Sequence, residues 1–361
     1  MTKVCFFSGD VTRNGGTERV SVTIANGLVR DEGFEICFLS LVEQKPEPCY
    51  EIDSRIERFA LGKKWLSPGP AYFPLIPKVR KFLKRRKIDV IIDIDIVLDV
   101  LSVPAAKGLK TKVISWEHSN LPYEMGIGYR RVILRHFTKR SDWIVTLTPG
   151  DAKAFQNVMK RTERITSIYN PASPPEISLE EIRDNLIITA ARLVPGKGFD
   201  LLTKVAKQVL PQFPEWKWLL LGEGPERETL EEFCKREGLE GQLLLMGYVP
   251  KVETYLARAK LFVLTSKAEG LPMCLLEARA HGVPCVSFDV PTGPADMIED
   301  GVNGYLIKPF DCEDMAGKLC TLMKDEGKLI AMRKQAPKNM DAFWLPEILR
   351  QWKELIRQLV S

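Results

Sequence analysis

The sequence of 361 residues is poor in histidine, with three, and its eight cysteines include no Cys-x-x-Cys pair. These shortages argue against a structural zinc site and favour reduced thiols in a cytoplasmic protein. No apolar run approaches the roughly 20 residues of a membrane-spanning helix, and the N-terminal apolar run is too short for a signal peptide. Low-complexity tracts and short repeats are also lacking. We therefore expect an intracellular, soluble, folded chain.

The composition is that of a globular protein, with 45% hydrophobic and 27% charged residues. A chain of this length predicts two domains. Charge is divided unevenly, because residues 1–170 hold 28 Lys and Arg against 19 Asp and Glu, whereas residues 171–361 hold 24 against 28. The basic first half indicates an anionic partner, and nucleic acid and a membrane surface are both candidates from charge alone.

Continuous apolar runs alternate with amphipathic segments along the whole chain, which favours parallel sheets covered on both faces. We predict an α/β protein with two Rossmann-like domains, spanning residues 1–170 and 185–343. A Pro-rich linker is expected at residues 171–184, and an apolar helix at about 344–361 is expected to pack back on the first domain. The expected strands are Lys3–Phe7, Phe34–Val42, Asp89–Ile94, Lys112–Trp116, Trp143–Leu147, Leu186–Ala190, Trp218–Leu221, Leu243–Met246, Leu261–Leu264, Cys285–Phe288 and Tyr305–Ile307.

Two glutamates, Glu269 and Glu277, flank a turn and the start of a helix. Gly270 and Pro272 predict the turn, and the helix is expected over Met273–His281. Free N–H groups at a helix start can bind a phosphate, and a carboxylate one turn further in can reach an attached sugar. Taken alone, each Glu is more often part of an acidic loop or a solvated helix face than of a binding site.

The segment Glu269–Glu277 resembles the E-x7-E motif of retaining glycosyltransferases of family 4, which have the GT-B fold with two Rossmann-like domains facing a central cleft. The resemblance covers essentially the whole chain. It implies that Glu277 grips the ribose of a nucleotide donor and that Glu269 contacts the transferred sugar. Residues within the motif, Leu271, Pro272 and Leu275, are implied to line the donor site.

A second segment, Ala190–Asp200, follows a strand and presents Arg192 and Lys197 on a Gly-containing loop. Arg clamps phosphate oxygens bidentately, whereas Lys acts as a point charge. The family resemblance implies that both cations hold the donor diphosphate and stabilise the leaving group. The family's usual Gly before the Arg is Ala191 here, a mild departure.

Further short matches extend the resemblance. Gly222 opens a G-E-G-P turn after a strand, and Tyr248 lies in the segment that faces the base in the family. Gly15 and Gly16 open the first helix, where small residues allow an anionic group to approach the backbone. His118 is implied to contact the donor sugar, with Glu117 as second choice, although a lone His is often structural. The segment Ser287–Asp296 resembles the family's loop that precedes a short helix, and it is implied to shape the wall of the donor pocket.

Asp93 and Asp95 spell the D-x-D pattern of metal-dependent GT-A transferases, in which carboxylates hold Mg²⁺ or Mn²⁺ on a diphosphate. No other part of the chain supplies a GT-A pattern, and Arg192 and Lys197 already neutralise a diphosphate. We therefore expect no metal and no cofactor.

The segment Lys78–Lys87 contains seven basic residues with apolar residues at helical spacing. This pattern suits an anionic bilayer surface, and it equally suits a solvated helix that packs its apolar stripe on the domain. A second basic cluster comprises Arg130, Arg131, Arg135, Lys139 and Arg140. Nucleic acid is not expected as a partner, because no recognised nucleic-acid module is present and aromatic residues are not interleaved with the charges.

The resemblance implies a retaining, metal-independent hexosyltransferase that moves a hexose or N-acetylhexosamine from a nucleoside diphosphate sugar to an acceptor hydroxyl. UDP is the nucleotide that we expect. Similarity of the GGTERV, EHSN and PTGPADMI segments to bacterial surface-polysaccharide enzymes (capsule or lipopolysaccharide) points to a lipid-linked glycan acceptor at the inner face of the plasma membrane. A GT-B-fold nucleotide-sugar epimerase and a non-catalytic GT-B partner subunit are the alternatives.

Overall fold

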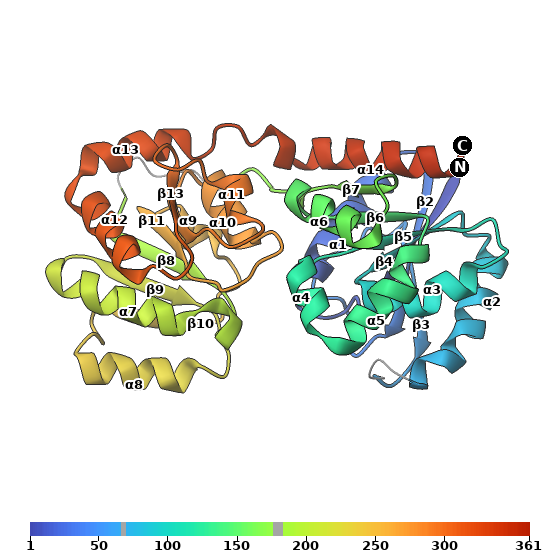
Figure 1. Ribbon diagram of the computed structural model, residues 1–361, viewed down its shortest axis with the longest axis horizontal. Helices are drawn as coiled ribbons and strands as arrows, with labels where there is room; N and C mark the ends of the chain where they lie inside the picture. The colour runs from blue at the N-terminus through green and yellow to red at the C-terminus, as the bar shows by residue number, and fades with distance from the viewer. Residues whose placement is uncertain (66–69, 176–182) are drawn as a thin grey trace. The chain divides into compact units, whose positions relative to one another are not determined.

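The computed structural model describes residues 1–65, 70–175 and 183–361. The chain forms two compact units, one of Met1–Pro171 with Leu345–Ser361 and the other of Ala172–Trp344 (Figure 1). Part of the expected linker, residues 176–182, lies outside the described residues. Within the described parts of the chain, no helix combines the length and apolarity needed to span a bilayer.

The first unit is built on a parallel sheet with the strand order β3-β2-β1-β4-β5-β6-β7. Of its central strands, β4 is buried throughout and β1 is buried from Val4 to Ser8, as their continuous apolar sequences predict. The strands are β1 (Thr2–Ser8), β2 (Phe34–Val42), β3 (Glu57–Gly62), β4 (Val90–Ile94), β5 (Lys112–Trp116), β6 (Trp143–Thr146) and β7 (Ile165–Ser167).

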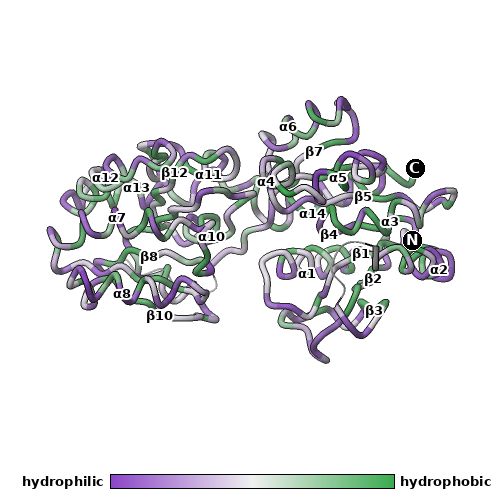
Figure 2. Tube along the Cα trace, turned by 60° about the horizontal axis from the view of Figure 1, so that its bottom comes forward, coloured by the Kyte–Doolittle hydropathy of each residue, from purple (hydrophilic) through white to green (hydrophobic). Residues whose placement is uncertain are grey.

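Helices cover the faces of this sheet, and Figure 2 shows hydrophobic strand segments in green beside helices with purple outer stretches. For example, Val79, Leu83 and Leu101 pack into one cluster with Phe7 and Ile91 of the strands. The helices of the first unit are α1 (Gly16–Leu28), α2 (Ile76–Arg86), α3 (Asp99–Ala106), α4 (Leu121–Gly126), α5 (Gly128–His136), α6 (Pro149–Met159) and α14 (Leu345–Val360).

The second unit has a parallel sheet with the strand order β10-β9-β8-β11-β12-β13. Its strands are β8 (Leu186–Ala190), β9 (Lys217–Leu221), β10 (Leu243–Gly247), β11 (Leu261–Leu264), β12 (Cys285–Phe288) and β13 (Gly304–Ile307). Its helices are α7 (Phe199–Val209), α8 (Arg227–Glu237), α9 (Glu253–Leu256), α10 (Met273–Ala280), α11 (Pro294–Met297), α12 (Cys312–Lys324) and α13 (Glu326–Gln335).

Each sheet has a point where the strand order reverses direction. In the first unit this point lies between β1 and β4, and in the second between β8 and β11. Open parallel sheets bind ligands outside the carboxyl ends of the strands at such a reversal. The two Rossmann-like sheets predicted from the sequence are confirmed. Their topology predicts that ligands bind at the loops that follow β1, β4, β8 and β11.

Candidate active site

The loop after β8 carries both cations that the sequence singled out. Arg192 is exposed, and Lys197 ends a single helical turn over Pro195–Lys197. Gly198 then starts α7 with φ +69°, and a Cβ there would lie 2.0 Å from the carbonyl oxygen of Thr265. The hydroxyl of Thr265 donates to the carbonyl oxygen of Lys197 at 3.2 Å. A glycine at 198 therefore lets the β8 loop lie directly against the β11 loop.

Lys197 and Glu269 meet across these two loops. Lys197 Nζ lies 2.6 Å from Glu269 Oε1, and the Glu269 side chain is 8% exposed while that of Lys197 is 26% exposed. A nearly buried carboxylate needs such a partner, because burial of an unpaired charge is costly. The fold thus joins two of the predicted catalytic residues in one ion pair at the reversal point of the second sheet.

The segment after β11 is anchored by its neighbours. The hydroxyl of Thr292 donates to the carbonyl oxygen of Glu269. Gly293, with φ +98°, lies so close to this segment that a Cβ would be 2.6 Å from Pro272 Cδ and 2.8 Å from the carbonyl oxygen of Gly270. The segment Ser287–Asp296 therefore contacts the Glu269 loop through the Thr292 hydroxyl and through the backbone at Gly293.

The expected helix after Pro272 is present as α10, which begins at Met273 and ends at Ala280. Glu277 lies on it and is half-buried. Leu271 and Pro272 are buried, and Leu275 is fully buried with its N–H donating to the carbonyl oxygen of Pro272 at 3.0 Å. Both the side chain and the N–H of Leu275 thus take part in packing the helix start, and its predicted contact with the donor stays a prediction.

The loops after β8 and β9 also pack backbone to backbone. Gly222 follows β9 with φ +151°, and a Cβ there would lie 1.9 Å from the carbonyl oxygen of Ala191. Its N–H donates to the carbonyl oxygen of Gly247 at 2.8 Å, next to Tyr248, which is 61% exposed. Gly222 and Tyr248 thus lie on neighbouring loops at the same edge as Arg192.

Cys274, also on α10, carries a thiol whose charge would interact with Glu269 and Lys197. Burial raises the pKa of its thiol to about 12, and the negative charge of Glu269 contributes in the same direction. A thiol with such a pKa stays protonated near neutral pH and is a poor nucleophile.

In the first unit, Gly15 and Gly16 lie at the start of α1, with Gly15 in extended conformation as its N-cap. A Cβ on Gly15 would lie 2.3 Å from Glu18 Oε2, and Glu18 is buried and paired with Arg13. A carboxylate therefore already occupies the space beside this helix start. An anion approaching Gly15 would have to displace it or share Arg13.

His118 follows β5, and its ring centroid lies 4.2 Å from that of Trp116. Burial lowers the pKa of His118 to about 3, so the imidazole is neutral at physiological pH. Its Nε2 is buried and has no hydrogen-bond partner within the described residues. The neighbouring Glu117 accepts a hydrogen bond from the Ser119 N–H at 2.7 Å.

The side chains of Asp93 and Asp95 lie in different surroundings, although the two residues have D-x-D spacing. Asp93 is fully buried and accepts a hydrogen bond from the Ser102 hydroxyl, and burial together with the nearby Asp99 raises its pKa well above the usual range. Asp95 accepts from the Val97 N–H and pairs with Arg130 at 2.8 Å. No group of three or more potential metal-ligating His, Cys, Asp or Glu side chains occurs in the described parts of the chain.

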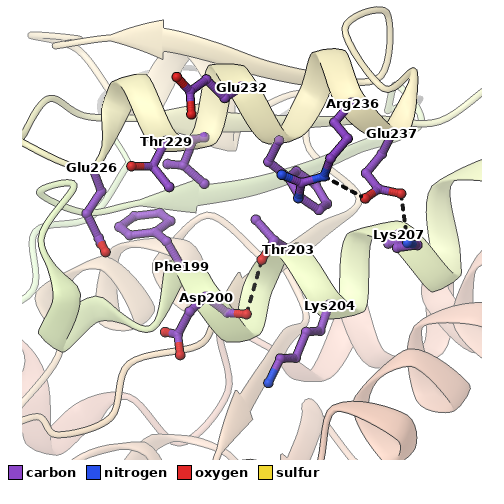
Figure 3. Close-up of a pocket in the computed structure, with 12 residues that line it drawn as sticks. Phe199, Asp200, Thr203, Lys204, Lys207, Glu226, Thr229, Glu232, Arg236 and Glu237 are labelled. Atoms are coloured by element: carbon purple, nitrogen blue, oxygen red, sulfur yellow. Dashed lines mark hydrogen bonds and ion pairs between the residues drawn. The ribbon is translucent and has the colours of Figure 1, made fainter.

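A cavity of about 400 Å³ lies between α7 and α8 of the second unit, with charged rims formed by pairs such as Lys207 and Glu237 (Figure 3). None of the site residues predicted from the sequence lines it. It therefore lies outside the candidate active site.

Comparison with known proteins identifies the family of the chain. The model of the family "Glycosyl transferases group 1" matches residues 175–339, and that of "Glycosyltransferase Family 4" matches residues 14–174. An uncharacterized glycosyltransferase of Haemophilus influenzae is 29% identical over 358 residues, covering 99% of this chain and 100% of its own length. An undecaprenol-diphosphate-glycan alpha-1,4-N-acetyl-D-galactosaminyltransferase of Campylobacter jejuni is 28% identical over 371 residues, covering 99% of each chain.

Solved structures show the same architecture. A Staphylococcus aureus TarM variant in complex with fondaparinux, alpha-GlcNAc-glycerol and UDP matches with a TM-score of 0.79 at 16% identity, covering 99% of this chain and 100% of that one. Anabaena HepE in complex with UDP matches with a TM-score of 0.77 at 20% identity and the same coverage.

The fold is therefore that of the GT-B glycosyltransferases. The chain belongs to the group 1 glycosyltransferases, as its motifs predicted.

Proposed function

We propose that this glycosyltransferase moves a hexose or N-acetylhexosamine from a UDP-sugar to a hydroxyl of a lipid-linked or polysaccharide acceptor, with retention of configuration. The observation that carries the proposal is the Lys197–Glu269 pair beside Arg192 at the reversal point of the second sheet. Fixed cations at this point suit a diphosphate.

In the proposed reaction, the bond between the sugar C1 and the diphosphate oxygen breaks while the acceptor oxygen bonds to C1 on the same face. The acceptor proton passes to the departing diphosphate. Arg192 and Lys197 stabilise the charge that grows on the leaving group, which accelerates the step because the interaction strengthens in the transition state. Neutral His118 offers the donor sugar a hydrogen bond without adding charge. Neither a protein nucleophile nor a metal is needed.

Lys197 and Glu269 have linked roles in this scheme. In the unliganded protein, Glu269 neutralises Lys197 across 2.6 Å. A bound diphosphate attracts Lys197 as well, so Lys197 bridges the leaving group and Glu269. The same pairing draws the Glu269 carboxylate toward the sugar carried by that diphosphate, where positive character develops at C1.

The relatives support a bacterial glycan as the acceptor. The Campylobacter jejuni relative is named for an undecaprenol-diphosphate glycan, and an Escherichia coli relative, 25% identical over 297 residues, is a lipopolysaccharide 1,6-galactosyltransferase. Both names describe addition of a sugar to a glycan that is attached to lipid. We therefore propose action at the inner face of a bacterial plasma membrane.

The α2 helix supports only part of the membrane expectation. Its apolar residues Val79 and Leu83 are buried, and Phe82 packs on the same core, so its apolar stripe faces the protein. Arg86 pairs with Glu57. The outward cations remain, and we propose that they attract an anionic surface by charge alone. They are Lys78, Lys81, Lys84, Arg85 and Lys87.

The proposal is tested by incubating the purified chain with UDP-glucose, UDP-galactose, UDP-GlcNAc and UDP-GalNAc, with and without an undecaprenyl-diphosphate-linked acceptor. Transfer to the acceptor by one donor, undiminished in EDTA, supports it. Interconversion of the donor sugar without an acceptor would indicate an epimerase. Loss of transfer in EDTA with recovery in Mn²⁺ would contradict the metal-free mechanism.

A further inference from the structure

The terminal helix α14 is fixed against α1 at two places. A Cβ on Gly27 would lie 2.5 Å from Leu349 Cδ1, so the helices approach closely only because residue 27 has no side chain. Asp31, just beyond α1, pairs with Lys353 at 3.0 Å and with Arg357 at 3.1 Å. These contacts fix both the distance and the register of α14.

In that register, Trp352 of α14 packs against Trp116, the last residue of strand β5. Trp352 is fully buried, and its ring meets Trp116 edge to face with centroids 4.9 Å apart. Trp116, also fully buried, lies 4.2 Å from the His118 ring. A continuous aromatic stack therefore leads from the last helix of the chain to His118.

Hydrogen bonds from the indole Nε1 atoms and the imidazole Nε2 atom do not hold this stack together. Trp116 Nε1, His118 Nε2 and Trp352 Nε1 are all buried, and none has a hydrogen-bond partner within residues 1–65, 70–175 and 183–361. Buried polar groups without partners are uncommon and call for an explanation. With Nε2 not engaged, packing against Trp116 restrains the plane of the imidazole ring.

We propose that Trp116 and Trp352 are positioning residues that set the orientation of the His118 ring, so that α14 completes the first unit's part of the active site. This inference rests on the role proposed above for His118 toward the donor sugar. Nε2 is buried without a partner among the described residues, so a sugar hydroxyl can accept from it or donate to it only after a local opening, and the stack holds the direction of that one hydrogen bond.

The test replaces Trp352 by Leu, which removes the ring that supports Trp116. The chain has three histidines, so the His118 signals can be assigned by NMR after isotope labelling of histidine. We expect Trp352→Leu to shift the His118 ring resonances and to lower kcat about tenfold, because small misplacements of a reacting contact are costly. The KM for the UDP-sugar and the Kd for UDP should stay within about twofold, since the diphosphate contacts lie in the second unit.

Two further variants separate positioning from loss of stability. Ile348→Ala removes another fully buried side chain from α14, and it should lower Tm without moving the His118 resonances. Trp352→Phe keeps an aromatic edge and should retain most of the activity with a smaller resonance shift. Unmoved His118 resonances in both Trp352 variants would overturn the positioning role.

His118→Ala tests the underlying function separately. A fall in kcat as large as that of Trp352→Leu, with no further fall in the double variant, supports action of Trp352 through His118. If His118→Ala leaves kcat unchanged, the proposed role of His118 is wrong. A resonance shift in Trp352→Leu would then still show that the stack orients the ring.

Discussion

The carboxyl edges of the two sheets both carry ion pairs, but they differ in the groups that they offer to a ligand. In the second unit, the edge is ionic, with exposed Arg192 beside the Lys197–Glu269 pair on loops packed backbone to backbone. In the first unit, carboxylates at the edge are paired within the unit, Glu18 with Arg13 and Asp95 with Arg130, and His118 is uncharged at physiological pH. In the proposed reaction, the second unit therefore supplies the charge stabilisation of the leaving group, and His118 of the first unit supplies a neutral hydrogen bond.

The largest expected effect concerns the ionic edge. Replacing Arg192 or Lys197 by Ala should lower kcat about 100-fold, because each charge-assisted contact contributes about 1.5–3 kcal/mol and strengthens as the leaving group departs. Steady-state kinetics with the active donor and acceptor would measure this. Lys267→Ala is the matched control, because this nearby exposed cation pairs only with Asp200 among the described residues. Activity within threefold of wild type for both site variants would contradict the assignment.

The next effect concerns the glycine contacts that hold the ionic edge together. Gly198→Ala places a Cβ against the Thr265 carbonyl oxygen at positive φ, and it should lower the free energy of unfolding by about 1–3 kcal/mol. Gly196→Ala, two residues away, meets nothing within 4 Å and should be nearly neutral. Urea unfolding of both variants measures the difference. Equal stabilities would show that the loop can move away at no cost.

Much of the fold was predictable because a buried strand has a continuous run of apolar residues in the sequence. The expected bounds of Phe34–Val42, Lys112–Trp116 and Cys285–Phe288 match β2, β5 and β12. Two strands were not predicted: β3, whose six residues mix polar and apolar side chains and are partly exposed, and β7, which has only three residues. Neither has the continuous apolar run that marks a buried strand.

The site was predictable as a set of residues and less so as a geometry. The motifs identified Lys197 and Glu269 separately, but their ion pair depends on Gly198 letting two distant loops touch. The Trp116–Trp352 contact joins the middle and the end of the chain, and helical spacing alone does not name the surface on which a helix docks. Likewise, the spacing in α2 fits a membrane face and a packed face equally.

A third prediction tests the buried carboxyl groups of Asp93 and Asp99 beneath the first unit's edge. Burial raises the pKa of Asp93 well above its usual range and that of Asp99 to about 6, with the neighbouring Asp95 carboxylate acting in the same direction on Asp99. The native state therefore binds more protons than the unfolded state above pH 4, and stability falls as the pH rises through 6. The loss should be roughly 2 kcal/mol between pH 4 and 7.

Urea unfolding as a function of pH would measure this loss. Asp93→Asn keeps a hydrogen-bond donor and cannot ionise, so its stability should vary less with pH over that interval. Glu32→Gln, a change at an exposed carboxyl of the same unit, should leave the profile of the wild type intact. Parallel profiles for wild type and Asp93→Asn would contradict a proton shared by the buried pair.

A fourth, smaller effect is expected at Glu277. Ribose contacts are similar in ground and transition states, so Glu277→Ala should weaken donor binding about tenfold and change kcat little. Glu277→Gln keeps one acceptor oxygen and should be milder. Titration calorimetry with the donor measures both, and Glu313→Ala on the exposed face of α12 provides the control. An unchanged Kd in the Ala variant would make Glu277 an ordinary helical residue.

The smallest effect concerns attraction of the first unit to an anionic surface. A Lys or Arg near such a surface contributes about 1 kcal/mol, and salt screens this attraction. We chose Lys84 and Arg85 because both are exposed, whereas the adjacent Arg86 already pairs with Glu57. The double change Lys84→Ser and Arg85→Ser should weaken sedimentation with phosphatidylglycerol vesicles about threefold at low salt, since other outward cations of α2 remain.

The matched control for this pair changes the same charge in the second unit. Lys334 and Lys338 are both exposed, and replacing both by Ser should leave vesicle binding near that of the wild type. Donor affinity should be unaffected in either double variant, because neither pair belongs to the ionic edge. Equal weakening by both pairs would mean that only net charge matters, and α2 would then have no particular role at the membrane.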